Sequence, residues 1–329
     1  MDIGLAYDLK SSFTAAAEAP IDRLEEYDEE STIAALEQAL RAHGHSPRRL
    51  GGGRAFAEAL LARPPQLVFN IAEGRGARSR EAQVPALCEM LGVPCTHSDP
   101  LALALSLDKA LTKRVVAAAG VPTPPFAVVR HLADLRKLKM GFPLLVKPLA
   151  EGSSMGVRLS SRVTDAEELR EECRRQLDDY DQPVLVEGFC PGVELTVGVL
   201  GVRGRAKVIG TMEIAPTQLG LESFVYSLEV KRDWRNQVAY KVPPTVAPAV
   251  VEEAEKIALQ AYAALDCRDV ARVDLRLDDA GRPAFIEINP LPGLNPETSD
   301  LCILARGRGM TYDSLIAGIV DSARARYKL

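Results

Sequence analysis

Two segments that alternate polar and apolar residues, joined by a turn-rich stretch, constrain the fold of this chain more than any other feature. The segments are 271–277 and 285–289, and residues 278–283 lie between them. Two β-like runs connected in this way predict a β-hairpin. Because side chains alternate between faces along a strand, the polar residues of both segments share one face of the hairpin and the apolar residues share the other.

The polar face of this hairpin carries two opposed acids. A hairpin centred on residues 280–281 sets Asp274 opposite Glu287 and Arg272 opposite Asn289. Two carboxylates directly opposed on a sheet repel each other unless a cation lies between them. Such oxygen ligands suit Mg²⁺, which proteins usually hold with one or two carboxylates plus substrate phosphates. The alternative is a solvated hairpin whose acids face water, since exposed acids are the commoner case.

Composition and charge restrict the class of protein. The chain has 329 residues, 47% of them hydrophobic and 26% charged, which is ordinary for a globular protein of two or three domains. A formal net charge of −5 argues against a general nucleic-acid binder, which normally carries a basic surface. No apolar run reaches the roughly 20 residues that span a bilayer, and no signal peptide is visible. We therefore expect a cytoplasmic protein without nucleic-acid or membrane partners.

The cysteines and histidines give no sign of a zinc site. The six cysteines are dispersed without a C-x-x-C pair, and there are only four histidines. Reduced, mostly buried thiols are the simplest interpretation.

The first hundred residues alternate strand and helix signals, which predicts a small parallel sheet covered by helices. The strand-like segments are 3–7 and 67–70, and the expected helices are 31–43 with Ser31 as its cap, 55–63 and 80–91. Residues 51–53 are three glycines without the Lys-Ser/Thr of a phosphate loop, so we expect a flexible loop there. Residues 10–30 hold seven acids, and we interpret them as an excursion or lid over the strand end.

A domain boundary is expected near residues 99–100. Residues 215–241 are polar and basic, and we expect them to be irregular. The strands expected after the boundary are 142–147, 183–187 and 194–200, and the expected helices are 108–119, 165–177, 250–265 and 311–326.

Lys147 and the loop that follows it have the chemistry of an anion site. Lys147 ends a strand-like segment, and residues 151–156 read Glu-Gly-Ser-Ser-Met-Gly. The two glycines allow close approach of the backbone to a ligand, and successive N–H groups in such a turn form an anion nest. Ser153 and Ser154 add hydroxyl donors, and Lys147 would hold a phosphate as a point charge. An ordinary Gly-Ser turn between strands remains the alternative.

Two glutamates at the ends of strand-like segments have the chemistry of a nucleoside-binding site. Glu187 follows four apolar strand residues, and Gly188 and Phe189 then offer free backbone groups and an aromatic face that suit an adenine ring. Glu194 begins the next strand, where it would bind ribose hydroxyls. The alternative is a pair of strand-end glutamates in water.

Taken in order along the chain, these residues resemble the ATP-grasp superfamily and, within it, the D-alanine–D-alanine ligase branch. The resemblance runs from near Val68 to the C-terminus, and its specificity comes from the combination. The segments that carry it are Leu-Ser-Leu-Asp-Lys at 105–109, Leu-Leu-Val-Lys-Pro at 144–148, Glu-Gly-Ser-Ser at 151–154, Val-Glu at 186–187, Glu-Leu-Thr-Val at 194–197, Ala-Arg-Val-Asp at 271–274, Glu-Ile-Asn-Pro at 287–290 and Pro-Gly at 292–293.

The resemblance implies an α/β fold with α+β lobes. Residues 1–100 would form a Rossmann-like parallel-sheet domain, residues 101–184 the central ATP-grasp subdomain and residues 185–329 the C-terminal one, with ATP between the last two. It also implies ATP with two Mg²⁺ ions, for which Mn²⁺ is an alternative, and a homodimer.

The resemblance also assigns roles. The residues assigned to ATP are Lys109 and Lys147 at the phosphates, Glu151, Ser153 and Ser154 on the covering loop, Glu187, Gly188 and Phe189 at adenine, Glu194 at the ribose and Lys231 at the γ-phosphate. The metal ligands would be Asp274, Glu287 and Asn289. Arg272 and the Gly293 amide would form an oxyanion site, with Ser153 and Lys231 also taking part in catalysis.

The implied reaction joins a carboxylate to an amine. Transfer of the γ-phosphoryl group makes an acyl phosphate, mainly by positioning and charge neutralisation. The amine then attacks, and the oxyanion donors stabilise the charge on the carbonyl oxygen. ADP and phosphate are released, and a closed lid excludes water from the intermediate.

The sequence departs from the branch at the substrate positions. The early Glu-Arg-Glu-Val-Ser segment is absent at residues 9–13, Arg232 replaces a catalytic-loop Tyr and Glu73 replaces a His. Glu73 would hold a substrate ammonium, or be a solvated loop acid, and Thr298 would meet a substrate carboxylate. We therefore expect an ATP-dependent carboxylate–amine ligase that joins two amino acids, or an amino acid and another small carboxylate, and whose substrates need not be D-alanine. The alternatives are a true D-alanine–D-alanine ligase of cell-wall synthesis and a non-catalytic ATP–Mg²⁺ binding protein.

Overall fold

The N-terminal part of the chain is a three-stranded parallel sheet covered by helices, as the alternating signals predict. A computed structural model describes residues 1–14, 20–76, 78–202, 204–218 and 220–329. The strand order is β2-β1-β3. The strands are β1 (Asp2–Ala6), β2 (Ser46–Gly51) and β3 (Leu67–Asn70), and the helices are η1 (Lys10–Ser12), α1 (Glu30–Ala42), α2 (Gly53–Ala62), η2 (Arg80–Ala82) and α3 (Gln83–Met90).

Three details of this domain differ from the prediction. Helix α1 begins at Glu30, with Glu29 rather than Ser31 at its cap. Strand β2 was not predicted, because it is an edge strand in which Leu50 is the one buried residue and no apolar alternation is visible. The expected loop at residues 51–53 is wrong in its extent, because Gly51 ends β2 and Gly53 begins α2, both with positive φ, so only Gly52 lies between the strand and the helix.

The central part of the chain is a four-stranded antiparallel sheet with one long helix packed on it. The sheet order is β4-β7-β5-β6. Asp165 caps the helix by accepting hydrogen bonds from two first-turn N–H groups, so the predicted start of this helix is confirmed. The elements are β4 (Phe126–Val129), η3 (Leu132–Lys137), β5 (Leu144–Pro148), η4 (Leu159–Ser161), β6 (Arg162–Val163), α6 (Ala166–Tyr180) and β7 (Val184–Gly188).

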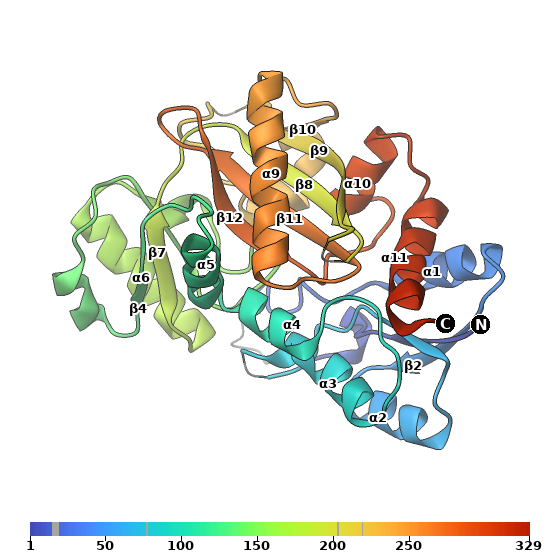
Figure 1. Cartoon of the computed structure of the whole chain (residues 1–329). Helices are drawn as coiled ribbons and strands as arrows, with labels where there is room; N and C mark the ends of the chain where they lie inside the picture. Colours follow the sequence, from blue (N-terminus) through green and yellow to red (C-terminus); the bar gives the residue numbers. More distant parts are fainter. Residues whose placement is uncertain (15–19, 77, 203, 219) are drawn as a thin grey trace.

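The C-terminal part is a five-stranded antiparallel sheet with order β10-β9-β8-β11-β12, and helix α9 lies across one face of it (Figure 1). Residues 215–241 were expected to be irregular, but they include the end of β9 and all of β10. Both strands lie at one side of the sheet, and only the last two residues of β9 and the four residues of β10 fall in this range, which is too short for a strand pattern to show. The elements are β8 (Glu194–Leu200), β9 (Lys207–Pro216), α7 (Leu228–Arg232), α8 (Trp234–Gln237), β10 (Val238–Lys241), α9 (Pro248–Ala264), β11 (Val270–Leu277), β12 (Pro283–Asn289) and α10 (Asp300–Gly307).

A helical link and the last helix join these parts. Helix α4 (Pro100–Leu107) is apolar on every side and has no helical stripe, which explains why the sequence pattern missed it, whereas α5 (Lys109–Ala118) was predicted. Asp99 caps the first and Asp108 caps the second. The last helix, α11 (Tyr312–Tyr327), returns to the N-terminal domain beside α1, so the two termini lie close together (Figure 1).

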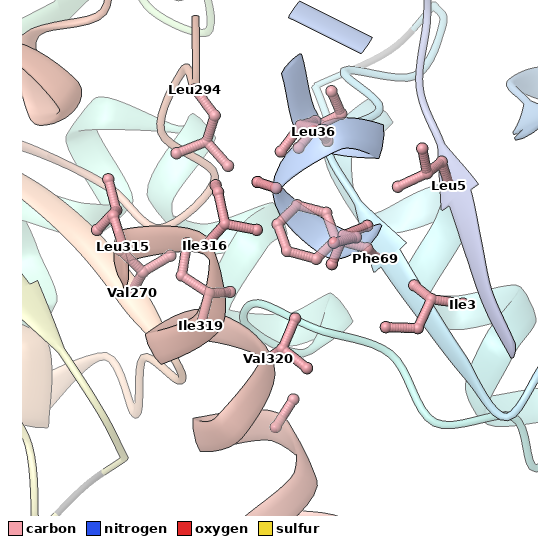
Figure 2. Close-up of a cluster of buried hydrophobic side chains, with 14 of the residues drawn as sticks. Ile3, Leu5, Leu36, Phe69, Val270, Leu294, Leu315, Ile316, Ile319 and Val320 are labelled. Atoms are coloured by element: carbon pink, nitrogen blue, oxygen red, sulfur yellow. The ribbon is translucent and has the colours of Figure 1, made fainter. Parts of the chain in front are cut away.

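The core beneath α11 is built from both ends of the chain. Figure 2 shows Ile3, Leu36 and Phe69 of the N-terminal domain facing Ile316 and Ile319 of α11, all fully buried. Burial of such side chains stabilises by about 1.5–3 kcal/mol each. The C-terminal helix therefore fixes the N-terminal sheet relative to the five-stranded sheet. All six cysteines are buried free thiols, as expected. In the described part of the chain, no helix combines the length and apolarity that a membrane span requires.

Candidate active site

The hairpin of β11 and β12 has the predicted register. Arg272 lies opposite Asn289 and Asp274 lies opposite Glu287, with an irregularity in the pairing directly after Asp274. The Asn289 amide nitrogen lies 3.4 Å from Asp274 Oδ2 and 3.5 Å from Glu287 Oε1, so one amide joins the two acids. Thr196 on β8 donates to Asp274 Oδ1 at 2.9 Å and orients this carboxylate.

The charges of these acids are balanced by cations from several elements. Arg272 Nη2 lies 2.9 Å from Asp274 Oδ2, and Lys109 Nζ lies 3.7 Å from Glu287 Oε2. Burial raises the pKa of Asp274 above its usual range. Burial also acts to raise the pKa of Glu287, but the nearby lysines Lys109 and Lys147 lower it well below its ordinary value. Glu287 is therefore ionised at neutral pH and available as a ligand.

The donor set fits a divalent cation that also binds phosphate. Asp274 and Glu287 offer carboxylate oxygens and Asn289 an amide oxygen, and Mg²⁺ takes ligands of this kind. Within the residues that the structure describes, no group of three or more Asp, Glu, His or Cys could hold a metal ion unaided. The set therefore suits an ion whose coordination is completed by phosphate oxygens and water.

Two adjoining cavities meet at this hairpin. The first is lined by nine predicted site residues: Lys109, Lys147, Glu151, Ser154, Glu194, Lys231, Arg272, Asp274 and Glu287. The second adds four more: Glu73, Ser153, Asn289 and Gly293. The residues common to both walls are Lys109, Glu151, Gly152, Lys231, Arg272 and Glu287. The two cavities are therefore compartments of one continuous site, and the residues between them include the cations Lys109, Lys231 and Arg272 and the acid Glu287.

Lys147 is held in place by a buried ion-pair cluster. Glu187 is 1% exposed, and its carboxylate lies 2.6 Å from Lys147 Nζ and 2.8 Å from Lys113 Nζ. Burial opposes the charge, but the two lysines lower the pKa of Glu187. Lys113 was missed by the sequence analysis, although it stands four residues after Lys109 and hence on the same side of α5.

The predicted adenine residues lie outside both cavities. Glu187 is covered by its two lysines, and Gly188 and Phe189 line a separate open groove. Two guanidinium groups lie over the Phe189 ring, with Arg276 at 4.7 Å and Arg162 at 5.1 Å from its centroid. The adenine assignment therefore stays a prediction.

Arg276 is a second residue that the sequence analysis missed. It lines the first cavity, is 6% exposed, and lies opposite Glu194 across β11 and β8. Its guanidinium donates to the carbonyl oxygens of Phe224 and Gly192 at 2.8 and 3.2 Å. Burial raises the pKa of Glu194 to about 7, and Arg276 opposes this shift. Arg276 lies on the same face of the strand as Arg272 and Asp274. The alternation of residues 271–277 could therefore have identified it as a candidate site residue.

The loop of residues 151–156 is the tight turn that was predicted. Ser153, Ser154 and Gly156 all have positive φ, at 49°, 57° and 77°. A side chain at Gly156 would overlap the ring of Pro148, so the turn is pressed against the end of β5. Ser154 Oγ donates to the Tyr226 carbonyl oxygen at 3.0 Å, which ties the loop to the segment before α7.

Residues 20–29 pack on this loop. Asp22 is fully buried and accepts from the Gly156 N–H at 3.0 Å and from the Tyr180 hydroxyl at 2.8 Å, and its carboxylate lies 2.9 Å from Arg158 Nη2. The lid interpretation of residues 10–30 falls partly on residues 15–19, which lie outside the described residues. The described remainder covers the loop and reaches the second cavity through Glu26.

Two predicted substrate residues do not reach the cavities. Arg232 points to Glu25, with Nη2 2.9 Å from Oε2, and Thr298 is exposed with its N–H bonded to Asn295. Neither lines the first or second cavity. Their substrate roles remain predictions.

The chain is similar to D-alanine–D-alanine ligases along most of its length. A family model described as D-ala D-ala ligase C-terminus matches residues 115–321. An uncharacterised protein, y4sG of Sinorhizobium fredii, is 35% identical and the match covers 91% of this chain and 88% of that protein. The D-alanine--D-alanine ligase of Rhodospirillum rubrum is 33% identical over 88% of this chain and 91% of its own length.

Solved structures show the same fold. The D-alanine--D-alanine ligase from Bacillus anthracis complexed with ATP superposes with a TM-score of 0.74 at 22% identity, covering 100% of this chain and 99% of that one. The VanG D-Ala:D-Ser ligase from Enterococcus faecalis has a TM-score of 0.76 at 18% identity, covering 98% and 99%. Since the family model matches more than half of the chain and relatives above 30% identity span nearly all of it, this chain belongs to the D-alanine–D-alanine ligase family of ATP-grasp enzymes, ATP-dependent ligases that form carbon–nitrogen bonds.

Proposed function

We propose that this enzyme joins two D-alanine molecules in an ATP-dependent reaction through an acyl phosphate. The observation that carries the proposal is the pair of adjoining cavities with a shared wall of Lys109, Lys231, Arg272 and Glu287. A nucleotide in the first cavity and an amino acid in the second would meet at this wall. The similarity to D-alanine--D-alanine ligases supports this substrate over the other amino acids that the sequence departures favour.

The first step makes the carboxylate reactive. A carboxylate is a poor electrophile, and transfer of the γ-phosphoryl group turns it into an acyl phosphate. Lys147, Lys109 and Lys231 line the first cavity and would neutralise the phosphate oxygens. A divalent cation, when bound by Asp274, Glu287 and Asn289, supplies further charge neutralisation for the phosphates. That two such ions would be held there is our proposal.

The second step is attack of an amine on the acyl carbon. Negative charge then develops on the carbonyl oxygen, and Arg272 with the Gly293 N–H would stabilise it. Arg272 is held by Asp274 at 2.9 Å and by Asp300 at 3.6 Å, so its position is fixed before substrate arrives. Removal of one such donor typically costs about 3 kcal/mol of transition-state stabilisation.

The second cavity supplies the contacts for the amino acid. Glu73 lines it and would hold the ammonium group of the phosphorylated substrate, and Ser153 on the covering loop would donate to a substrate oxygen. The loop and residues 20–29 would shield the acyl phosphate from water.

The test is ADP release with D-alanine and Mg²⁺, with the product identified by mass. The proposal predicts ADP and the D-alanyl-D-alanine mass with D-alanine as the sole amino acid. If ADP were released only with a different pair of substrates from a panel of D- and L-amino acids, the result would instead support a carboxylate–amine ligase of other specificity. Nucleotide binding without turnover on any pair would support a non-catalytic protein.

Three further statements are proposals. The chain would divide into units at residues 1–100, 101–184 and 185–329, it would form a homodimer, and it would act in the cytoplasm. Limited proteolysis and sedimentation equilibrium test the first two, and fractionation of cells tests the third.

A further inference from the structure

One wall of the second cavity is formed by three glutamates of the N-terminal domain. Glu73 follows β3, Glu81 belongs to η2 and Glu26 belongs to the segment before α1. Glu26 and Glu81 were not among the site residues expected from sequence. No local pattern links the three, because they come from different elements.

Gly74 brings this wall together. It has a φ of +72°, and a side chain there would overlap the Arg80 carbonyl oxygen. Its N–H donates to Asp8 Oδ2 at 2.9 Å, and the Arg75 carbonyl oxygen accepts from Gln83 Nε2 at 2.7 Å. The loop that carries Glu73 is therefore pressed directly against the turn that carries Glu81.

The charges of this wall are unbalanced. Arg80 is the cation beside it, and its guanidinium bonds to both Glu26 oxygens, to the Ala150 carbonyl oxygen at 2.9 Å and to Glu151 at 3.4 Å. Glu73 and Glu81 make no hydrogen bond or ion pair with any residue that the structure describes. Two carboxylates thus face the cavity without a partner, at a mutual electrostatic cost.

Other residues that line the second cavity are cationic or offer backbone donors. Lys231 and Arg272 also line the first cavity, and Gly293 contributes its backbone. An amino acid in the second cavity would turn its carboxyl group toward these donors and its ammonium group toward the acids. One amino acid supplies one ammonium group and would leave the second carboxylate uncompensated, whereas two amino acids compensate both.

We propose that Glu73 and Glu81 each receive one substrate ammonium group, Glu73 that of the phosphorylated amino acid and Glu81 that of the attacking one, so that the acceptor must be an amine rather than a hydroxy acid. The proposal rests on the proposed function, because it names the substrate class of the same site. We assign the acceptor ammonium to Glu81 because the charge of Lys109 acts on this carboxylate. Lys109 lines both cavities, and the attacking amine must lie where the two cavities meet.

The attacking amine must lose protons, and Glu81 is placed to take one. The charged groups around Glu81 are Arg80, Glu26, Lys109 and Glu73. Burial raises the pKa of Glu81 to about 7, against the opposing effect of Arg80. A base with a pKa near the working pH is the most effective.

The proton balance of the step is complete. The acceptor ammonium gives one proton to the Glu81 carboxylate, and the neutral amine then forms the C–N bond and leaves negative charge on the carbonyl oxygen. The C–O bond to phosphate breaks when the carbonyl group re-forms. The second amine proton leaves on the phosphate as HPO₄²⁻, and Glu81 returns its proton to water. A hydroxy acid would bring no ammonium group and would leave Glu81 unpaired.

The experiment compares Glu81→Gln and Glu73→Gln with Glu89→Gln, an exposed control on the neighbouring helix α3. D-Alanine is the donor, and either D-alanine or D-lactate is the acceptor. We expect the wild type to form only the amide. Glu81→Gln should lower kcat/KM for the acceptor by about 100-fold. It should also remove the decrease of kcat/KM below about pH 7, as loss of a general base does. Glu73→Gln should raise the KM of the first amino acid by about 10-fold and leave the pH dependence of kcat/KM unchanged. Glu89→Gln should leave both KM and kcat/KM unchanged.

A binding measurement separates this proposal from the proposed function. Calorimetry with Mg²⁺ and a non-hydrolysable ATP analogue compares a panel of amino acids with the matching hydroxy acids, using variants whose thermal unfolding matches that of the wild type. The proposed function would be wrong if D-alanine caused no ADP release. This inference would still hold if the protein bound amino acids and Glu73→Gln and Glu81→Gln weakened that binding. ADP release that is unchanged in both variants, D-lactate used as well as D-alanine, or no binding that depends on these glutamates would overturn the inference.

Discussion

Asp274 on β11 lies directly opposite Glu287 on β12, and Asn289 joins the two carboxylates from 3.4 and 3.5 Å. Two acids held this close are unfavourable without a cation between them. Arg272 and Lys109 provide part of that charge from outside the pair. We therefore propose that the hairpin is preorganised for a metal ion.

The first prediction concerns this metal site. Glu287→Gln should lower the rate of ADP formation by at least about 100-fold, because charge neutralisation of the phosphates is the main catalytic contribution in phosphoryl transfer. Addition of Mg²⁺ with a non-hydrolysable ATP analogue should raise the Tm of the wild type and not that of the variant. Glu252→Gln, an exposed change on α9, serves as the control. An equal rise of Tm in Glu287→Gln would show that the ion binds elsewhere.

The second prediction concerns the buried cluster of Lys113, Glu187 and Lys147. Glu187→Gln leaves two buried lysines without a counter-charge and should reduce the free energy of unfolding by about 3–5 kcal/mol, measured by urea denaturation at pH 7. It should also raise the KM for ATP, because Lys147 loses the carboxylate that orients it. Glu171→Gln on the exposed side of α6 should leave both quantities unchanged.

The same cluster predicts a pH dependence. The pKa of Glu187 is lowered in the folded protein, so its stabilising effect is present above the unfolded pKa of about 4.3 and is lost as the pH falls through the folded value. The difference in unfolding free energy between wild type and Glu187→Gln should therefore be constant between pH 6 and 8 and shrink below about pH 4. A difference that grows on acidification would contradict this assignment.

The third prediction concerns Asp22, which ties residues 20–29 to the loop of residues 151–156. Burial acts to raise the pKa of Asp22, but the Gly156 N–H, Tyr180 and Arg158 lower it overall. Asp22→Asn should cost about 1.5–3 kcal/mol at neutral pH, the usual range for a hydrogen bond to a charged group, and less as the pH falls below the unfolded pKa of about 3.9. Hydrogen exchange should become faster in residues 152–158.

If Asp22 acts only by packing, Asp22→Asn should leave the exchange of that loop unchanged. Asp181→Asn, an exposed change just after α6, is the matched control for exchange and stability.

The fourth prediction compares two glycines of one loop. Gly74→Ala should destabilise the protein by several kcal/mol or prevent folding, because the new Cβ would overlap the Arg80 backbone in addition to the strain of a positive φ. Gly76→Ala has a similar φ of +86° and no atom within 4 Å, so it should cost only about 1 kcal/mol. Equal unfolding free energies for the two variants would show that the overlap at Gly74 is relieved without cost.

Local patterns of the sequence determined much of the catalytic half of this protein. The alternation of 271–277 and 285–289 was enough to predict the register of Asp274 with Glu287, because a strand repeats every two residues and a short hairpin leaves little freedom. Helix stripes and caps predicted α5, α6, α9 and α11 to within a few residues. The order of motifs was enough for the family, because such a combination is rare even where each piece is common.

Only the tertiary structure decided which partners these residues meet. Lys113 and Lys147 converge on Glu187 from two elements, Arg232 turns to Glu25, and α11 completes the N-terminal core. The acidic wall likewise assembles from three separate segments. Such contacts join residues tens to hundreds of positions apart, where no local period carries a signal. They depend on how whole elements pack, and this is why the register of the β11–β12 hairpin could be predicted from sequence while the acidic wall of the second cavity could not.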